Sequence, residues 1–556
     1  MNQRPEPDLL SFAGRWVARV RGKVIAQGST REEALRAAKI SRPKENPEVS
    51  FMAPPSAEKN EALLQTILAA VPARQTIHLV GGAVRDRLLG RASGDLDFAV
   101  PQGALKLARG VANRTQGAFF PLDEESDTGR IVYVHEDGTR TRADFAAYRR
   151  PDLASDLAAR DFSINAIALD PRTNENLDPV GGLKDLRDKR IRACSPQSLT
   201  DDPVRILRAV RLAASLGFNI QLETRKLMKE AAPLLSRVSP ERLRDELLKM
   251  LGGPRPATSL RALELLGALP YLLPELPALK SVGQPAPHVH DVWAHTLAVV
   301  GHLEGILAAL EPGRTPGEDT DLFEGMISLR LGRYRQHFAA HFSSDPASES
   351  TPRSLLFFAA LYHDIAKPQT RALHEGRVRF LGHDELGTRV TAERARALRL
   401  SNDDISRLKA IVAHHMRLHF FTNRLAVKNS PPSRRAIYRF FRDAHEAGVD
   451  LCLLGLADLR GTYEQTLPQE LWTACLDVCR ILLENWWEKP QETVSPPNLV
   501  NGHDLIASLG LIPGPIVGKV LEAVQEAQAT GGLPPGATRE EALAFAQGWL
   551  AEAGRQ

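Results

Sequence analysis

The sequence predicts a multidomain protein in which an α/β head is followed by a mainly helical body. From Ala62 to about Asp170, helix-like segments alternate with short apolar strands. From Asp201 onward, apolar residues recur with the 3.6-residue period of amphipathic helices. The length of 556 residues agrees with this division, because roughly 150 residues per domain allow three to four domains.

Composition narrows the class of protein. Hydrophobic residues make up 43% and charged residues 25%, which excludes wholesale disorder and fibrous repeats. The net charge of +4 permits a nucleic-acid partner without indicating one. Four scattered cysteines exclude a disulfide scaffold and favour a reducing cytoplasm, with Cys475 and Cys479 expected in the core. Neither a signal peptide nor a run of about 18 apolar residues is evident, which disfavours export and membrane spanning.

The first 58 residues are expected to form an accessory unit and a linker. A hairpin and an Ala-rich helix ending near Ile40 are predicted first, and the four prolines of Ser41–Glu58 then indicate a linker. The predicted hairpin comprises Trp16–Val20, a turn at Arg21–Gly22 and Val24–Gln27, and Ser29 or Thr30 caps the helix.

The head is expected to contain a helix, a strand, a Gly-Gly turn, a second helix and further strands. Two Pro- and acid-rich intervals in the body are read as surface insertions, and the Pro490–Pro497 break precedes a compact helical tail. The head elements are Ala62–Ala70, Thr76–Val80, a helix from Ala83, Leu96–Val100, Ile131–Val134 and Thr141–Ala147, and the insertions are Glu311–Asp321 and Ser343–Arg353.

A phosphate-binding and metal-binding pattern lies in the head. After the strand ending at Val80, Gly81 and Gly82 open a helix, and a later strand carries Asp95 and Asp97. Residues at i and i+2 of a strand point to the same face, so both carboxylates can hold one or two Mg²⁺ ions. The two glycines let backbone N–H groups approach a triphosphate.

These motifs resemble the class II tRNA nucleotidyltransferase and poly(A) polymerase family. The strand motif Leu79-Val-Gly-Gly-Ala-Val-Arg-Asp86 carries the likeness, and 159–166 is similar to the family's next motif, with Ala159 in place of its first arginine. The resemblance implies an α/β head with a mixed or antiparallel sheet, and tRNA, CTP and ATP as partners. It also implies nucleotide binding by Arg85, Arg160, Asp161 and Asn165, with Asp161 on the ribose.

The segment beginning at Asp201 resembles the family's nucleotide-selecting helix. A carboxylate and a guanidinium at i and i+3 share a helix face and can present acceptors and donors to a base edge. The resemblance gives this role to Asp202 and Arg205. Arg208 and Arg211 continue the basic face, either toward triphosphate or tRNA or as a solvated helix side. Asp144 is either a third catalytic carboxylate, as in the wider superfamily, or an ordinary strand acid.

Thirteen of the 16 histidines lie between His288 and His445. An imidazole next to a carboxylate, joined by distant histidine and aspartate ligands, suits a divalent metal that binds water and phosphate. The spacing resembles the HD-domain metal phosphohydrolases. The resemblance implies a divalent metal of unspecified identity, with Lys367 facing a substrate phosphate. Either His415 or the adjacent His414 faces inward, and the sequence leaves this choice open. The implied ligands are His295, His363, Asp364, His383, His415 and Asp458.

The expected organisation is an accessory unit (1–58), a nucleotidyltransferase head (59–190), an all-α neck (191–270), an HD-type body (271–488) and a helical tail (489–556). We expect template-independent addition of CMP and AMP to tRNA 3′ ends, with phosphohydrolase activity at the HD site. The alternatives are poly(A) addition, or CC-only or A-only addition, which a flexible loop around Pro121–Arg130 would distinguish. A hydrolase with an RNA-binding head is the alternative of another class, while protein-uridylylating and alarmone enzymes lack support.

Overall fold

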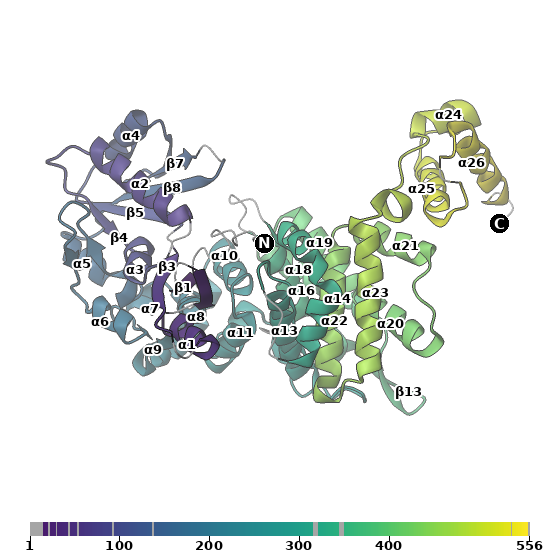
Figure 1. The fold of residues 1–556 in the computed structure, drawn as a ribbon, viewed down its shortest axis with the longest axis horizontal. Helices are drawn as coiled ribbons and strands as arrows, with labels where there is room; N and C mark the ends of the chain where they lie inside the picture. The colour runs from purple at the N-terminus through teal and green to yellow at the C-terminus, as the bar shows by residue number, and fades with distance from the viewer. Residues whose placement is uncertain are drawn as a thin grey trace. The chain divides into compact units, whose positions relative to one another are not determined.

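The computed structural model describes residues 15–20, 23–28, 31–42, 45–52, 55–91, 94–135, 138–314, 321–343, 350–534 and 536–553. The chain forms two compact units, residues 1–234 and 235–556. The first holds the mixed-sheet head and the second is almost entirely helical (Figure 1). The predicted fold class is confirmed.

A three-stranded sheet at the N-terminus corrects the predicted linker. Strand β3 lies inside the proline-rich stretch and pairs antiparallel with β1, and helix α2 begins there as well. The prolines flank β3 and leave its backbone donors available to the sheet, so they mark its ends. The predicted turn at Arg21–Gly22 and the caps Ser29 and Thr30 lie outside the described residues. The elements are β1 (Arg15–Val20), β2 (Lys23–Gly28), α1 (Arg31–Ser41), β3 (Glu48–Met52) and α2 (Pro55–Ala70).

The head is built on a seven-stranded sheet of order β10-β9-β4-β5-β8-β7-β6. Among the described strands of this sheet, only β5 and β8 are parallel neighbours. Phe98 of β5 and Phe145 of β8 stack with ring centroids 4.8 Å apart, and both side chains are buried. Helix α4 packs on β7 and β8. The elements are β4 (His78–Val80), α3 (Gly82–Leu88), β5 (Asp95–Val100), α4 (Ala104–Thr115), β6 (Ala118–Asp123), β7 (Thr128–Val134), β8 (Arg140–Ala147), β9 (Ala168–Leu169) and β10 (Asn176–Leu177).

The segment Pro121–Arg130, expected as a flexible loop, forms the ends of two paired strands and the turn at residues 124–127 that joins them. Strands β6 and β7 pair antiparallel, with Pro121 opposite Gly129. The Asp127 carboxylate accepts hydrogen bonds of 2.8 Å from the backbone N–H groups of both Ala104 and Leu105, at the start of α4. A carboxylate at a helix N-terminus is favourable, so the turn is tied to the head core.

The remainder of the first unit leads from the head into the neck. A parallel two-residue pairing joins β11 to β12, a strand that the helical period did not predict. The elements are α5 (Leu153–Ala158), η2 (Ser163–Asn165), α6 (Gly182–Arg187), β11 (Arg190–Ile191), α7 (Ser198–Asp201), α8 (Arg205–Leu216), β12 (Asn219–Ile220) and α9 (Leu222–Ala231).

The second unit is a helical body with one exposed hairpin, β13–β14, which the all-α prediction missed. Cys475 and Cys479 are buried, as expected. Its elements are η3 (Ala232–Arg237), α10 (Pro240–Leu251), α11 (Pro256–Leu265), α12 (Leu269–Leu272), η4 (Leu276–Leu279), α13 (Val292–Ala309), α14 (Leu322–Leu331), η5 (Gly332–Tyr334), α15 (Arg335–Phe342), α16 (Pro352–Tyr362), α17 (Lys367–Thr370), β13 (Arg371–His374), β14 (Arg377–Phe380), α18 (His383–Ala397), α19 (Asn402–His414), α20 (Met416–Lys428), α21 (Arg434–Ala444), α22 (Ala447–Tyr463), η6 (Glu464–Thr466), α23 (Gln469–Trp487) and η7 (Pro490–Val494).

Helix α13 alone among the described helices is long and apolar enough to cross a membrane by length and composition, and 61% of it is buried inside the protein. It packs against α11, α16 and α22. Such burial is typical of the central helix of a domain core.

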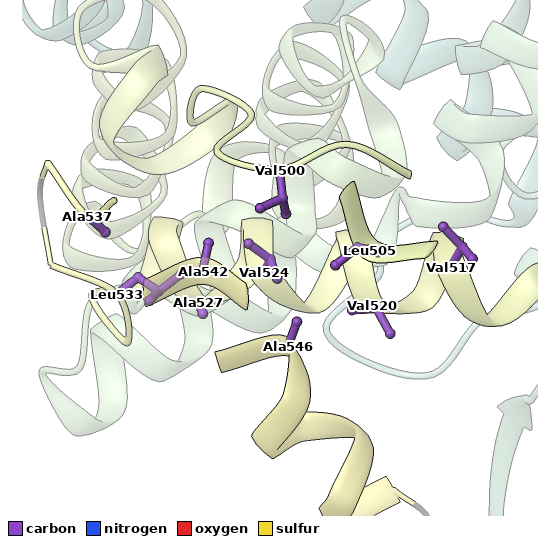
Figure 2. Packing of buried hydrophobic residues seen from close by; sticks show 10 residues of the cluster. All are labelled: Val500, Leu505, Val517, Val520, Val524, Ala527, Leu533, Ala537, Ala542 and Ala546. Atoms are coloured by element: carbon purple, nitrogen blue, oxygen red, sulfur yellow. The ribbon is translucent and has the colours of Figure 1, made fainter. Parts of the chain in front are cut away.

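The tail has a small core of its own. Val517, Val520 and Val524 of α25 belong to one buried cluster with Leu505 of α24 and Ala546 of α26 (Figure 2). The three helices are α24 (Gly502–Leu509), α25 (Pro515–Thr530) and α26 (Arg539–Ala553).

Candidate functional sites

The turn at Gly81 and Gly82 lies against the carboxylate of Asp97 and the guanidinium of Arg160. Gly81 has φ +71°, and a Cβ there would lie 3.2 Å from Asp97 Oδ2 and 3.4 Å from Arg160 Nη1. Only glycine adopts this backbone at low cost, and its missing side chain leaves the turn open. Arg85, on the helix that follows, donates to Asn165 Oδ1 at 2.8 Å.

Three carboxylates line neighbouring strands beside this turn. In the parallel pairing of β5 with β8, Asp97 lies directly opposite Asp144, and Asp95 lies opposite Arg142. Burial, followed by the charge of Asp144, raises the pKa of Asp97 to about 6. Burial also raises the pKa of Asp95. An oxygen-only set with crowded negative charge fits a divalent cation such as Mg²⁺.

Arg130 is a site residue that the sequence did not reveal. Its Nε and Nη2 donate to the two carboxylate oxygens of Asp144, both at 2.8 Å. The pairing follows from register, because Arg130 of β7 lies opposite Asp144 of β8. Within the described residues, the head carboxylates do not form a set whose ligand atoms all lie within 4.8 Å of one another.

Asp161 is the centre of a buried network. Its carboxylate accepts from Asn165 Nδ2 at 3.1 Å and from the Phe162 backbone N–H at 2.7 Å. The Arg208 Nε lies 2.7 Å from its other oxygen. Arg208 therefore joins α8 to the Asp161 motif, while Arg160 pairs with Asp156 at 3.5 Å.

The structure changes the geometry expected for the nucleotide-selecting pair. Asp202 has extended backbone (φ −146°, ψ 91°) between α7 and α8, so it does not share a helix face with Arg205. Pro203 follows it, which disfavours helical backbone at Asp202. The two side chains still meet, with Arg205 Nε 3.7 Å from Asp202 Oδ2. Arg205 is held by Ser198, whose Oγ lies 2.9 Å from Nη1, and Arg211 lies further along α8.

The six predicted HD-site residues come together in the second unit. They fall into two sets whose ligand atoms lie within 4.8 Å of one another, and all six side chains are buried. They come from α13, α18 and α22 and from the C-terminal ends of α16 and α19 (Figure 1). The first set is His295, His363 and Asp458, and the second is Asp364, His383 and His415.

Backbone hydrogen bonds fix how three of these histidines face the centre. In His363, His383 and His415, Nδ1 lies 2.7–2.8 Å from the backbone carbonyl three residues earlier. The Nδ1 atom must carry the proton to donate to a carbonyl, so the Nε2 lone pair is left to bind a metal.

The nitrogen and oxygen atoms that could bind a metal lie close together at this centre, and several of them form no good hydrogen bond with one another. His295 Nε2 lies 3.0 Å from Asp458 Oδ1, and His383 Nε2 lies 3.2 Å from His415 Nε2. Both ring nitrogens of His295 and both oxygens of Asp364 are buried and form no hydrogen bond of good geometry, although His295 Nε2 and Asp364 Oδ2 have charged neighbours within 3.0 Å. Burial lowers the pKa of His415 to about 3, so its ring is neutral. Such a set fits divalent metal binding.

Three neighbours complete this centre. Lys367 Nζ lies 2.6 Å from Asp364 Oδ2 and donates to Gln284, so it contacts a predicted metal ligand directly. His288 lies against His295, with ring centroids 5.3 Å apart. His419 was missed: its Nε2 lies 2.7 Å from Asp458 Oδ2. The i,i+4 spacing from His415 was the available signal.

Known protein families match three separate parts of this chain. Three family models match: "Poly A polymerase head domain" over residues 77–192, "Probable RNA and SrmB- binding site of polymerase A" over 217–279, and "HD domain" over 292–448. The last ends before Asp458.

Two curated relatives match most of the chain. An A-adding tRNA nucleotidyltransferase of Deinococcus radiodurans is 34% identical over 485 residues, covering 85% of this chain and 95% of that protein. A CC-adding tRNA nucleotidyltransferase of Thermus thermophilus is 33% identical, covering 84% and 93%. A solved complex of a CCA-adding enzyme with CTP shares the fold, with a TM-score of 0.53, 20% identity, and coverage of 88% and 96%.

Proposed function

The chain belongs to the tRNA nucleotidyltransferase family, and we propose that it adds CMP and AMP from CTP and ATP to the 3′ end of tRNA without a template. The observation that carries the proposal is the set of three carboxylates beside a glycine turn, with Asp97 opposite Asp144 and against Gly81. The relatives named for A and CC addition support the same chemistry.

In this proposal each part of the head has a separate task. The backbone at Gly81 and Gly82 receives the triphosphate, and Asp161 holds the ribose while Asn165 and Arg208 hold Asp161. When bound at Asp95 and Asp97, Mg²⁺ supplies activation of the attacking hydroxyl and neutralisation of the departing pyrophosphate.

The base is selected by protein side chains. Asp202 and Arg205 offer acceptors and donors to the Watson–Crick edge of cytosine or adenine, and Ser198 fixes the guanidinium. Arg211 extends the basic face of α8 toward the RNA.

A one-step enzyme is the second candidate function, because the two relatives described above carry only A-adding and CC-adding names. The test incubates the purified protein with tRNA lacking CCA, tRNA ending in C, and tRNA ending in CC, each with one labelled nucleotide. Full CCA addition predicts incorporation on all three with the proper nucleotide. Incorporation of C alone, on tRNA lacking CCA and on tRNA ending in C, indicates a CC-adding enzyme. Incorporation of A alone, on tRNA ending in CC, indicates an A-adding enzyme, and a ladder of A residues indicates poly(A) addition.

The second unit is proposed to be a divalent-metal phosphohydrolase acting on phosphomonoesters or 2′,3′-cyclic phosphates. Its support is the buried set of histidines and aspartates, several of whose ring nitrogens and carboxylate oxygens form no good hydrogen bond. Release of phosphate from p-nitrophenyl phosphate or a 2′,3′-cyclic nucleotide should need added metal and should be lost in Asp364→Asn. Hydrolysis that Asp364→Asn retains would contradict the proposal. We also propose the reducing cytoplasm as the compartment, which the four scattered cysteines favour.

A further inference from the structure

A groove between α20 and α21 is lined by side chains that belong to neither candidate site. It encloses about 640 Å³ and combines aromatic and sulfur side chains from α20 with arginines from α20 and α21. The apolar members are unusually open to solvent, since Phe420 is 59% exposed and Met416 is 45% exposed. Exposed large apolar side chains gathered in a hollow indicate an interaction surface.

The aromatic part of the groove is supported from below. The Phe420 ring lies 6.0 Å from the ring of Phe421, which in turn lies 6.1 Å from the buried ring of Phe440. Phe420 therefore presents an exposed ring above a packed aromatic pair. A supported, exposed ring is suited to stacking with another flat ring, because little side-chain entropy is lost when the partner binds.

The arginines beside this ring are held in place and retain free donor capacity. Arg435 and Arg439 both pair with Glu526 Oε1, at 2.9 and 2.8 Å, although their own side chains are 63% and 52% exposed. Arg417 and Arg442 share Asp443, and Arg442 also pairs with Glu522. A guanidinium carries five N–H donors, so one carboxylate shared by two arginines leaves donors and positive charge for a further anion.

The basic surface continues beyond the groove. A second hollow of about 450 Å³ is also lined by Arg435 and Arg439. It adds Lys519, Phe545 and Trp549 from the tail, together with Glu522 and Glu526. Both hollows therefore combine cationic and aromatic side chains, and the two shared arginines lie where they meet. Alternation of stacking rings and phosphate-binding cations along a groove is the pattern by which proteins hold single-stranded nucleic acid.

We propose that this groove, with Arg435 and Arg439 at its centre, binds an RNA segment with unstacked bases in the tRNA substrate. In this arrangement Phe420 stacks on a base, and the exposed guanidiniums of Arg435 and Arg439 bind the flanking phosphates. The inference rests on the proposed function, because it takes tRNA as the substrate. An acidic protein segment would match the arginines but would leave the aromatic platform without a flat partner.

The experiment measures binding of fluorescently labelled tRNA lacking CCA to the full chain over a series of salt concentrations. Phe420→Ala removes the platform without disturbing an ion pair, and it should raise the Kd about tenfold with an unchanged salt slope. The double variant Arg435→Gln and Arg439→Gln should raise the Kd and flatten the salt slope by about two. Val427→Ala, 80% exposed on the same helix but outside the groove, should match the wild type.

Nucleotide incorporation by the same samples separates a failure of RNA binding by the groove from a failure of the proposed function. The groove variants should need more tRNA for half-maximal rate while keeping the wild-type rate at saturating tRNA. A wild-type Kd for tRNA in both Phe420→Ala and the double variant overturns the proposal that the groove binds RNA, whatever the enzyme's activity. This is the result expected if the groove binds an acidic protein instead. Absence of incorporation by the wild-type protein, with tRNA binding that still depends on Phe420, contradicts the proposed function alone.

Discussion

Replacing His419 with alanine should weaken metal binding in the second unit even though His419 belongs to neither ligand set. Its Nε2 lies 2.7 Å from Asp458 Oδ2, while Asp458 Oδ1 lies 3.0 Å from His295 Nε2. One oxygen of the carboxylate is thus fixed by His419, and the other faces the Nε2 atoms of His295 and His363, the other two members of its ligand set. Without His419, the buried carboxylate loses the partner that sets its rotamer.

The size of the effect follows from that geometry. Residues that orient a metal ligand typically contribute about 10- to 100-fold in affinity, which corresponds to about 1.4–2.7 kcal/mol. The short bond to a buried carboxylate places His419→Ala within this range, and Asp458→Ala should lose more because it removes a ligand itself. His419→Gln, which keeps a donor, should recover part of the affinity.

The assay is a titration of metal-free protein with Mn²⁺ or Co²⁺, followed by calorimetry and by the visible spectrum of bound Co²⁺. His414→Ala is the matched control, because His414 adjoins His415 but belongs to neither ligand set among the described residues. A wild-type affinity and Co²⁺ spectrum in His419→Ala, together with metal loss in Asp458→Ala, would refute the positioning role.

Three further predictions concern the turn, the metal and the body surface. Gly81→Ala should reduce nucleotide incorporation at least tenfold, because its Cβ would press on Asp97 at 3.2 Å, whereas Gly90→Ala has a similar positive φ but nothing within 4 Å and should stay active. Removing metal with a chelator should lower the thermal midpoint of the wild type, as ligand linkage requires, and should leave Asp364→Asn unchanged, as scanning calorimetry would record. The pKa of Asp443 is lowered in the folded protein: burial alone would raise it, but hydrogen bonds from Arg417 and Arg442 outweigh burial. The carboxylate therefore stabilises the fold above the unfolded pKa of 3.8, and this stabilisation is lost as pH falls through the lowered pKa. Asp443→Asn should therefore lower the midpoint by a few degrees at pH 7 and progressively less toward acid, and an equal loss at all pH values would contradict that assignment.

Short sequence patterns were enough to predict the aspartate pair on a strand and the residues of the HD site, because each depends on the spacing of nearby residues. The i,i+2 spacing of Asp95 and Asp97 needs only a strand, and β5 supplies it. The HD-site residues carried their own signal through the His363–Asp364 pair. Within the adjacent histidine pair, the helix end placed His415 inward, a choice that one sequence left open.

Features that depend on strand register or on long-range pairing could not be read in the same way. Arg130 meets Asp144 only because β7 and β8 align them, and no local pattern records that register. Strand β3 was hidden by prolines that in fact flank it, and the contact of Asp127 with the start of α4 joins residues 22 and 23 positions apart. Pro203 was the overlooked sign that Asp202 precedes its helix.

The proposed function gives one chain two separate chemistries, nucleotide transfer at Asp97 and metal-dependent hydrolysis at Asp364. The most direct test measures labelled CTP and ATP incorporation into tRNA lacking CCA, and phosphate release from a 2′,3′-cyclic nucleotide, on the same preparations of Asp97→Asn and Asp364→Asn. We predict that Asp97→Asn loses incorporation by at least a thousandfold and keeps hydrolysis, while Asp364→Asn shows the reverse. Incorporation that survives Asp97→Asn, or loss of both activities in either variant while the protein stays folded, would contradict the account.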